Sequence, residues 1–364
     1  MRISFDVASL MNPRTGVGHY AATLLDRMMT IEPDNDFTLF ALTWGGDPSR
    51  VPRGPRVEFR RSRIPARVMT AWELAGRPKG ETLTGEADVV HGPNFWIPPI
   101  SRTNGIVTIH DMTFWLYPEL VPAFGKRLRR LVPRVLRRCA AVITPSRFIA
   151  DQVASELHFP SERIFVTHEG VRGTFQGAEP DPKIESSLGV HRPYLLFAGT
   201  QEPRKNLDRL IQSLQLIDPA LSLVIAGPPG WGSVDLKALA HKLHLDDRVV
   251  FAGYQSDAGV ASLMAGATAF VYPSLYEGFG LPPLEAMIAG SPVVAGRAGA
   301  LPEVLGDAPF YCDPEDVASI ASAIEAAVTS ESSETVARGR RQASKYDWNQ
   351  TARQTLEAYR VAAG

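Results

Sequence analysis

Two glutamates in the segment YPSLYEGFGLPPLEAMIAGSPVV (residues 272–294) have the spacing and the surroundings of a ligand site. Glu277 lies in a loop with Gly278 and Gly280, and Glu285 follows two prolines that suit the first turn of a helix. Glycines just before a helix allow backbone N–H groups to approach a ligand closely, and the helix dipole favours an anion such as a phosphate. Carboxylates accept hydrogen bonds from sugar hydroxyls. The segment therefore predicts a site for a phosphorylated, polyhydroxylated ligand.

Each feature of this segment has a simpler explanation when it is taken alone. Glycines of this kind commonly make a turn, and an acid in the first helical turn complements the helix dipole. What favours a ligand site is that the glycines, the acids and the helix start coincide in one short segment, which we treat as a motif hypothesis.

A basic pair lies in a second segment with the same kind of surroundings. Pro203-Arg204-Lys205-Asn206 directly follows a strand-like run at 194–199 and directly precedes a helical pattern. The carboxyl ends of strands are where α/β folds bind ligands. Arg204 and Lys205 can neutralise a diphosphate and the charge on its leaving group, as a divalent metal does in other phosphate-transferring enzymes. Because positive charge at a helix start is mildly unfavourable, a ligand explains the pair better than an exposed position does.

Several signals in the first half of the chain are weaker. Thr15-Gly16-Val17-Gly18 follows the first strand-like run and precedes a helix, but a lone glycine pair is more often a tight turn. His110 ends another strand-like run, where a hydrogen-bonded structural histidine is the more common finding. His168, Asn94 and Ser146 also stand at expected strand ends, and a loop at the rim of a site or a helix cap explains them nearly as well.

The elements that must position these residues are visible as a regular alternation. Short apolar runs rich in β-branched residues alternate with helix-period segments along almost the whole chain, which predicts an α/β fold with parallel sheets. The expected strands are residues 2–7, 37–42, 88–91, 105–110, 141–145 and 164–167, then 194–199, 222–226, 249–253, 269–272, 292–295 and 309–312.

A polar segment with two prolines, GAEPDPKIESSLG (177–189), separates these two series of strands and is interpreted as an interdomain linker. We therefore expect a first domain over residues 1–178 and a second over residues 190–345. Residues 346–364 are expected to form an amphipathic helix that packs back on the first domain. The arginine-rich stretch 50–67 is expected to be an exposed polar segment.

The Glu277–Glu285 pattern resembles the E-x7-E donor signature of the retaining GT-B glycosyltransferases, the mannosyltransferase-like family 4 enzymes. The resemblance extends to residues 6–25, 142–153 and 198–211, so it spans nearly the whole chain. It implies two Rossmann-like domains that face each other across a cleft. It also implies transfer of a hexose from a nucleotide-sugar donor to a saccharide or lipid-linked saccharide acceptor in polysaccharide biosynthesis. Mannose is the first expectation for the hexose, with GDP-mannose as its donor. Retention of configuration and independence from metals and other cofactors follow from the resemblance only.

The same resemblance implies a role for each matching residue. Glu285 would bind the ribose diol and Glu277 the hydroxyls of the donor sugar, while Arg204 and Lys205 would stabilise the departing diphosphate. His110 would lie near the donor sugar and the acceptor. The remaining contacts of the implied site are the backbone around the sugar and diphosphate at Gly278, Phe279, Gly280 and Leu281, the turn at Gly199 and Thr200, and the loop at Gly16, Val17 and Gly18 that would meet the diphosphate across the cleft.

One departure from the family pattern concerns the cations. Many members carry an arginine shortly after the strand glycine, whereas here Thr200 and Gln201 follow Gly199. Arg204 is then expected to replace that arginine, which leaves the division of roles between Arg204 and Lys205 open. Two alternatives to a transferase also stay open at this point: a sugar-nucleotide epimerase of the same shape, and a non-catalytic scaffold that binds nucleotide sugars.

Composition limits the remaining possibilities. At 364 residues and 45% hydrophobic content the chain suits two domains, and it has no long apolar run or leader pattern, so a cytoplasmic protein is expected. Cys139 and Cys312 are far apart, which supports neither a disulfide framework nor a cysteine metal site. Residues 1–175 carry 23 Lys/Arg and 17 Asp/Glu, a balance of +6, and the rest carries 15 and 22, a balance of −7. With a pI near 6.7 and no recognised module, nucleic acid is not expected as a partner.

Two further segments resemble functional motifs and also have structural explanations. KRLRRLVPRVLRR (126–138) interleaves seven basic residues with apolar ones. It can either lie peripherally on the anionic inner face of a membrane or pack its apolar positions on the sheet with its arginines solvated, and the charge pattern favours neither. The sequence Asp-Asn-Asp at 34–36 resembles a metal-binding motif, but a turn after Pro33 explains it better, and no metal is predicted.

Overall fold

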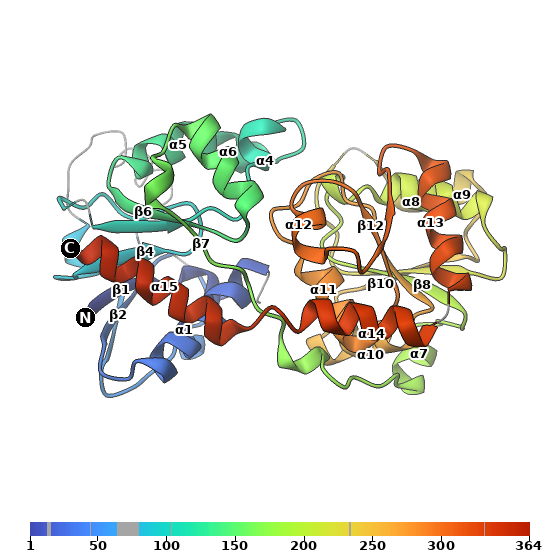
Figure 1. The fold of residues 1–364 in the computed structure, drawn as a ribbon, viewed down its shortest axis with the longest axis horizontal. Helices are drawn as coiled ribbons and strands as arrows, with labels where there is room; N and C mark the ends of the chain where they lie inside the picture. Colours follow the sequence, from blue (N-terminus) through green and yellow to red (C-terminus); the bar gives the residue numbers. More distant parts are fainter. Residues whose placement is uncertain (13–15, 44, 64–79, 103, 233, 331) are drawn as a thin grey trace. The chain divides into compact units, whose positions relative to one another are not determined.

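The computed structural model describes residues 1–12, 16–43, 45–63, 80–102, 104–232, 234–330 and 332–364. It divides into two compact units (Figure 1). Unit 1 comprises Met1–Pro118, Ala123–Gly170 and Trp348–Gly364, and unit 2 comprises Glu119–Pro122 and Val171–Asp347.

Unit 1 contains a seven-stranded parallel sheet with the strand order β3-β2-β1-β4-β5-β6-β7. The order reverses between β1 and β4, as in doubly wound nucleotide-binding folds. The strands are β1 (Arg2–Asp6), β2 (Asp36–Leu42), β3 (Val57–Ser62), β4 (Val89–Gly92), β5 (Gly105–Thr108), β6 (Cys139–Thr144) and β7 (Ile164–Val166). Its helices include α1 (Gly16–Ile31), α3 (Glu81–Thr84), α4 (Thr113–Leu116), α5 (Ala123–Leu136), α6 (Arg147–Leu157) and α15 (Trp348–Ala363).

Strand β3 corrects the expectation that residues 50–67 form an exposed polar segment. Val57–Ser62 pairs in parallel with β2 along its whole length. Its polar sequence, VEFRRS, is tolerated because β3 is the last strand on its side of the sheet, where charged side chains reach water and discourage further pairing. Glu58 and Arg60, for example, form an ion pair of 2.7 Å at the surface. Residues 64–67 of that stretch lie outside the described residues.

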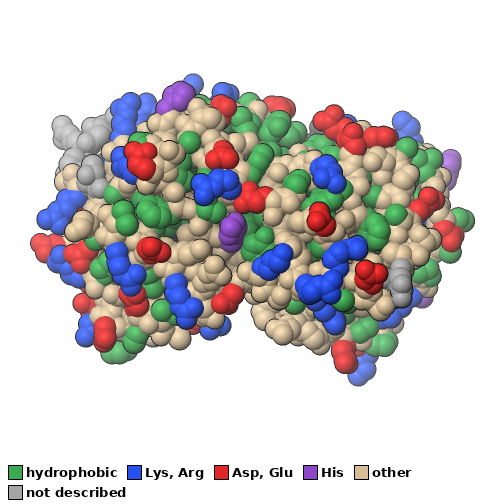
Figure 2. Space-filling model, viewed as in Figure 1, with side chains coloured by type: hydrophobic (Ala, Val, Ile, Leu, Met, Phe, Trp, Pro, Cys, Tyr) green, Lys and Arg blue, Asp and Glu red, His purple; other side chains and the backbone are tan. Residues whose placement is uncertain are grey.

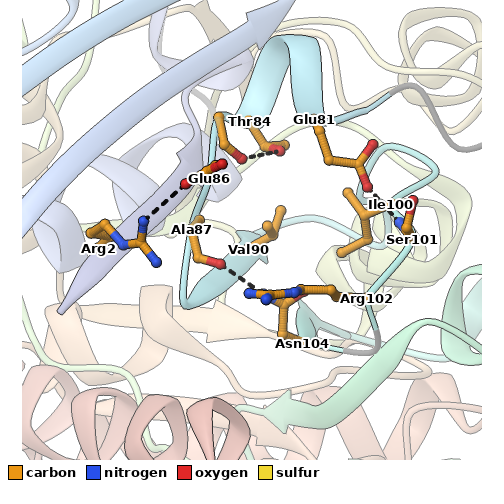
Figure 3. A pocket seen from close by; sticks show the side chains of 11 residues that line it. Arg2, Glu81, Thr84, Glu86, Ala87, Val90, Ile100, Ser101, Arg102 and Asn104 are labelled. Carbon is orange, nitrogen blue, oxygen red and sulfur yellow. Dashed lines mark hydrogen bonds and ion pairs between the residues drawn. The ribbon is translucent and has the colours of Figure 1, made fainter.

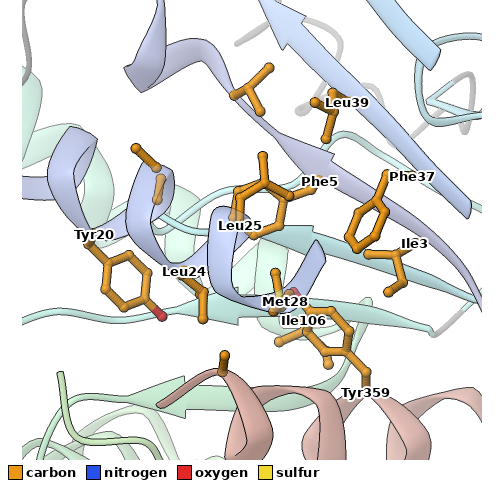
Figure 4. Packing of buried hydrophobic residues seen from close by; sticks show 14 of the residues in the cluster. Ile3, Phe5, Tyr20, Leu24, Leu25, Met28, Phe37, Leu39, Ile106 and Tyr359 are labelled. Atoms are coloured by element: carbon orange, nitrogen blue, oxygen red, sulfur yellow. The ribbon is translucent and has the colours of Figure 1, made fainter. Parts of the chain in front are cut away.

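The C-terminal segment forms the predicted helix, α15, and packs on α1 in the core of unit 1. Figure 4 shows Tyr359 of α15 directed toward Met28 of α1 and Ile106 of β5. Its hydroxyl lies 2.5 Å from Nδ1 of His91, and Nε2 of His91 lies 2.9 Å from the hydroxyl of Thr108. A chain of buried hydrogen bonds therefore ties the last helix to β4 and β5.

Helix α5 settles how the basic segment 126–138 is packed. Leu128, Val132, Val135 and Leu136 are buried, and the helix contacts α4 and β6. Its basic side chains are exposed at Lys126, Arg127, Arg129 and Arg130, and Arg137, directly after the helix, is exposed as well. The apolar positions thus pack inside the unit, as the second interpretation predicted. None of the described helices is long and apolar enough to span a bilayer.

Unit 2 contains a six-stranded parallel sheet with the order β10-β9-β8-β11-β12-β13. All six strands expected between residues 194 and 312 are present. They are β8 (Tyr194–Ala198), β9 (Ser222–Ala226), β10 (Val249–Gly253), β11 (Ala269–Tyr272), β12 (Val293–Gly296) and β13 (Phe310–Cys312). The α-helices are α7 (Pro182–Ser187), α8 (Leu207–Ser213), α9 (Leu236–Lys242), α10 (Asp257–Gly266), α11 (Leu281–Ala289), α12 (Leu301–Leu305), α13 (Val317–Thr329) and α14 (Ser332–Ala343).

Residues 177–189, expected to be a linker, instead contain helix α7 and belong to unit 2. Asp181 caps this helix by accepting a hydrogen bond from the Lys183 amide, and Pro182 occupies its first turn. The carboxylate of Glu185 then pairs with Arg192 at 2.7 Å. A helix of six residues is too short to show the periodicity that reveals longer helices.

Two smaller predictions are confirmed. Pro33–Asn35 form a turn before β2, in which the buried Asn35 donates to Glu32 at 2.8 Å. Cys139 and Cys312 are both buried and unbridged. Figure 2 shows acidic and basic side chains interspersed over the visible face of both units.

Candidate active site

The candidate residues of unit 2 lie at the point where its strand order reverses. Strands β8 and β11 are neighbours at this reversal, and ligands of doubly wound folds bind beside the carboxyl ends of such strands. The loop after β8 is tied to the loop after β11 by two hydrogen bonds: the Leu275 amide donates to the Arg204 carbonyl at 2.8 Å, and the Asn206 side chain donates to the Pro273 carbonyl at 3.0 Å. These hydrogen bonds bring together the two segments predicted from the sequence, residues 203–206 and residues 272–294.

Glu277 is held between the two predicted cations. Its Oε1 lies 2.6 Å from Nζ of Lys205, and its Oε2 lies 2.7 Å from Nη1 of Arg204. Arg204 also pairs with Glu202 at 2.8 Å, and Lys205 also donates to the Tyr272 hydroxyl. Glu277 and Lys205 are each only 6% exposed. The two cations are therefore arranged around a fixed carboxylate.

The pKa values follow from this arrangement. Burial alone would raise the pKa of Glu277, but the charges of Arg204 and Lys205 outweigh it and lower that pKa to about 2. Burial, followed by the neighbouring charge of Arg204, lowers the pKa of Lys205. The carboxylate is therefore fully ionised at neutral pH.

The glycine-rich loop is shaped by steric limits. Gly280 has φ +116° immediately before α11, and a Cβ there would lie 2.6 Å from Leu301. Phe279 is buried against Tyr346, with ring centroids 5.4 Å apart, so its side chain packs into the unit. On the strand side, Gly199 has φ +151°. The backbone at Gly199 and Gly280 therefore adopts conformations that favour glycine, and these conformations shape the loops whose amides would lie near a ligand.

A further glycine, missed by sequence reasoning, supports Glu277. Gly299 has φ +59°, and a Cβ there would lie 2.5 Å from the carbonyl oxygen and 2.6 Å from the amide nitrogen of Glu277. The next residue, Ala300, donates its amide to the same carbonyl at 2.9 Å. The loop after β12 therefore fixes the backbone of Glu277, and nothing short of the tertiary contact marks this glycine in the sequence.

Glu285 has a partner that the sequence did not predict. Arg172 forms two parallel hydrogen bonds with it, Nε to Oε1 at 2.6 Å and Nη2 to Oε2 at 3.0 Å. Arg172 also pairs with Asp257 of α10 at 2.9 Å. Burial opposes the charge of Arg172, but Glu285 and Asp257 raise its pKa. Because 113 residues separate Arg172 from Glu285, no local spacing reveals the pair.

His110 follows β5 in unit 1 and is held at both ring nitrogens. Nε2 donates to the Pro93 carbonyl at 2.8 Å, and Nδ1 lies 3.3 Å from Oε1 of Glu169. The ring of Tyr20 packs edge-on at 4.7 Å. Burial would lower the pKa of His110, but the bond to Glu169 outweighs it and the pKa is raised. Glu169, which is 6% exposed, is a second residue that sequence reasoning missed.

The other residues singled out in unit 1 have mixed outcomes. Helix α1 begins at Gly16, and a Cβ on Gly16 would meet nothing within 4 Å, while Thr15 lies outside the described residues. Ser146 caps α6 by accepting from the Ile149 amide at 3.2 Å, as the simpler explanation predicted. The His168 carbonyl accepts from Thr351, and the Asn94 side chain is exposed.

Two cavities, one in each unit, differ in their position relative to the candidate residues. A cavity of about 410 Å³ (Figure 3) is lined by residues at the amino edge of the unit 1 sheet, including Arg2 and Asn104, so it lies away from the strand ends that carry the candidates. A cavity of about 240 Å³ in unit 2 is lined by Glu202, Asp208 and Trp231 and therefore adjoins the loop after β8. Within the described ranges, no group of three or more His, Cys, Asp or Glu side chains is placed to hold a metal ion.

Comparison with known proteins finds glycosyltransferases that match this chain over nearly its whole length. Residues 182–346 match the family "Glycosyl transferases group 1", and residues 14–172 match "Glycosyltransferase Family 4". O-antigen chain mannosyltransferase B of Escherichia coli is 30% identical over 382 aligned positions, which cover 99% of this chain and 100% of that protein.

Solved structures share the fold. Sucrose-phosphate synthase of Thermosynechococcus elongatus has a TM-score of 0.78 at 19% identity, with 99% of this chain and 98% of that one covered. HepE of Anabaena, in complex with UDP and glucose, has a TM-score of 0.72 at 21% identity, with 98% of each chain covered. Together with the full-length relative and the two parallel sheets, these matches show that the chain is a glycosyltransferase of the GT-B fold and belongs to the group 1 and family 4 glycosyltransferases.

Proposed function

We propose that this glycosyltransferase transfers a mannosyl residue from a nucleotide-diphosphate sugar to a saccharide or lipid-linked saccharide. GDP-mannose is the donor that we expect first. The observation that carries the donor site is the carboxylate of Glu277, buried between Lys205 and Arg204 at the reversal of the unit 2 sheet. The full-length relative, named a mannosyltransferase of the O-antigen chain, supports mannose as the sugar.

Unit 2 would bind the donor through the predicted residues. Glu285 would accept hydrogen bonds from the ribose diol and Glu277 from hydroxyls of the sugar. The amides at Phe279, Gly280 and Leu281 would lie near the sugar and the diphosphate, at the start of α11. In unit 1, His110 would contact the sugar or the acceptor, with Glu169 holding its ring.

The chemistry follows from charge at the leaving group. The bond between the anomeric carbon and the diphosphate oxygen breaks, and its electron pair leaves with the diphosphate. The oxygen of the acceptor hydroxyl forms the new bond to the anomeric carbon, and its proton passes to an oxygen of the departing diphosphate. Arg204, Lys205 and the helix amides would stabilise the charge that develops on the diphosphate, so the reaction would need no metal. By its family, the product would retain the anomeric configuration.

The test is a panel of GDP-mannose, UDP-glucose and UDP-N-acetylglucosamine, scored by thermal shift and by slow hydrolysis, with wild type beside Glu285→Ala and Lys205→Ala. One donor should raise the melting temperature and be hydrolysed, and both substitutions should abolish this. Product analysis without acceptor covers the alternatives: an isomerised nucleotide sugar would indicate an epimerase, and binding without turnover would indicate a scaffold. If no donor binds, the proposed site is wrong.

For unit 1 we propose a peripheral contact with an anionic membrane through the exposed cations of α5. Because the apolar side of α5 is buried, this contact would be electrostatic and would weaken with salt. Sedimentation with phosphatidylglycerol vesicles, against phosphatidylcholine vesicles, should show binding that Lys126→Glu with Arg127→Glu abolishes. The same reversal at the exposed Lys237 and Lys242 of α9 is the control and should leave binding unchanged. Equal binding to both kinds of vesicle would contradict the proposal.

A further inference from the structure

The guanidinium of Arg172 holds the carboxylate of Glu285. Arg172 contacts both of its oxygens, at 2.6 and 3.0 Å, in the planar two-bond arrangement that only arginine can make. The side chain of Glu285 is 4% exposed and that of Arg172 is 19% exposed. This geometry sets the direction of the carboxylate and places a positive charge beside it.

Arg172 is itself anchored by two other groups. Its Nη1 lies 2.9 Å from Oδ1 of Asp257, the first residue of α10. Its guanidinium also lies over the ring of Phe175, 4.8 Å from the centroid. Moving the side chain away from Glu285 would break contacts with three residues at once. The arginine is therefore a fixed support and not a loose counter-ion.

A buried carboxylate that lacked this support would behave differently. Without Arg172 it would lose two charge-assisted hydrogen bonds and could turn toward another donor. Such a turn would spoil an acceptor intended for two neighbouring hydroxyls, because both of its oxygens must face them. The arginine keeps the carboxylate of Glu285 oriented before any ligand arrives.

We propose that Arg172 is a positioning residue for the ribose of the donor, acting through Glu285. The inference rests on the proposed role of Glu285 in binding the ribose diol. The opposite arrangement would be a mask, in which Arg172 occupies Glu285 and must leave before the nucleotide binds. Anchoring by Asp257 and Phe175 favours support over masking, and the two arrangements give opposite results on removal of the arginine.

The experiment measures binding of GDP and 2′-deoxy-GDP by calorimetry to wild type, Arg172→Met, Arg172→Lys and Glu285→Gln. Arg172→Met should weaken GDP about ten- to hundredfold, the loss expected for a charged hydrogen bond. It should also reduce the preference for GDP over 2′-deoxy-GDP, which a merely structural change would leave intact. Arg172→Lys should recover only part of the lost affinity. The double variant Arg172→Met/Glu285→Gln should bind GDP no more weakly than Glu285→Gln alone.

Two further variants keep the result interpretable. Arg192→Met removes the arginine of another carboxylate pair in unit 2, with Glu185, and should leave both affinities unchanged. Asp257→Asn, at a side chain that is 43% exposed, should shift affinity in the same direction as Arg172→Met but by less, and it is the variant to use if Arg172→Met does not fold.

The outcomes separate the inference from the proposed function. Tighter binding of GDP to Arg172→Met would show a mask and overturn the inference. Unchanged binding by the Arg172 variants, with Glu285→Gln weakened and the ribose preference lost, would overturn the inference and leave the donor site standing. If Glu285→Gln itself changes neither affinity nor preference, the proposed role of Glu285 fails, and the inference fails with it.

Discussion

Nζ of Lys205 lies 2.6 Å from Oε1 of Glu277, which is 72 residues further along the chain, and both side chains are buried at the edge of a parallel sheet. Strands β8 and β11 are neighbours because the strand order reverses there, so the loops that follow them must meet. The topology of unit 2 thus joins two segments that the sequence presents separately.

Replacing Glu277 by glutamine should remove the charge that compensates Arg204 and Lys205 while keeping the shape. Because both cations would then be buried beside an amide, we expect a loss of about 3–5 kcal/mol in the free energy of unfolding of unit 2, with donor hydrolysis abolished. Urea unfolding and the hydrolysis assay measure the two effects. Glu58→Gln, which breaks an exposed pair with Arg60 of similar length, is the control and should cost less than about 1 kcal/mol. A similar cost for both variants would contradict the argument.

His110 and Glu169 provide a prediction about pH. The pKa of His110 is raised in the folded protein, mainly because Glu169 outweighs the effect of burial. The stability from this pair is therefore fully present below the unfolded pKa, about 6.5, and is lost as pH rises through the folded pKa. Glu169→Gln should lower the His110 pKa measured by NMR, and its destabilisation should be largest at acidic pH. Glu162→Gln, at an exposed carboxylate of unit 1, is the control. An unshifted His110 would show that Glu169 does not stabilise its charge.

The buried bond between Tyr359 and His91 should hold the C-terminal helix in place. Tyr359→Phe leaves Nδ1 of His91 without that partner in a fully buried position, so we expect a loss of about 1–3 kcal/mol. Thermal unfolding measures it, with Tyr254→Phe, at a side-chain position that is 67% exposed, as the matched control. Equal melting temperatures for the two variants would mean that the apolar packing of α15 suffices without the hydrogen bond.

The sequence predicted those elements whose signal is local. Buried parallel strands are continuous apolar runs, so all six strands of unit 2 could be located, and the loop with Glu277 was marked by its glycines and prolines. Strand β3 was missed because an edge strand can be as polar as a loop. Helix α7 was missed because its six residues show no period.

The partners of the candidate residues could not be predicted in the same way. Glu169 and Arg172 are three positions apart in a loop that follows β7, and neither belongs to a motif. Glu169 contacts His110 and Arg172 contacts Glu285 only because the folds of their units bring them there. Long-range ion pairs of this kind depend on tertiary structure, whereas the residues that they support were visible from type and spacing.

Gly299 supplies the last prediction, since it limits the position of Glu277 by its lack of a side chain. Gly299→Ala would place a Cβ 2.5 Å from the Glu277 carbonyl oxygen at a residue with φ +59°, so the loop with Glu277 must shift. We expect donor hydrolysis to fall by about a hundredfold, because small displacements of catalytic groups have large effects on rate. We also expect a stability cost of about 1–2 kcal/mol from the left-handed backbone. Gly173→Ala, where a Cβ would meet nothing within 4 Å, is the control. Wild-type hydrolysis by Gly299→Ala would show that Glu277 keeps its position without the close approach of residue 299.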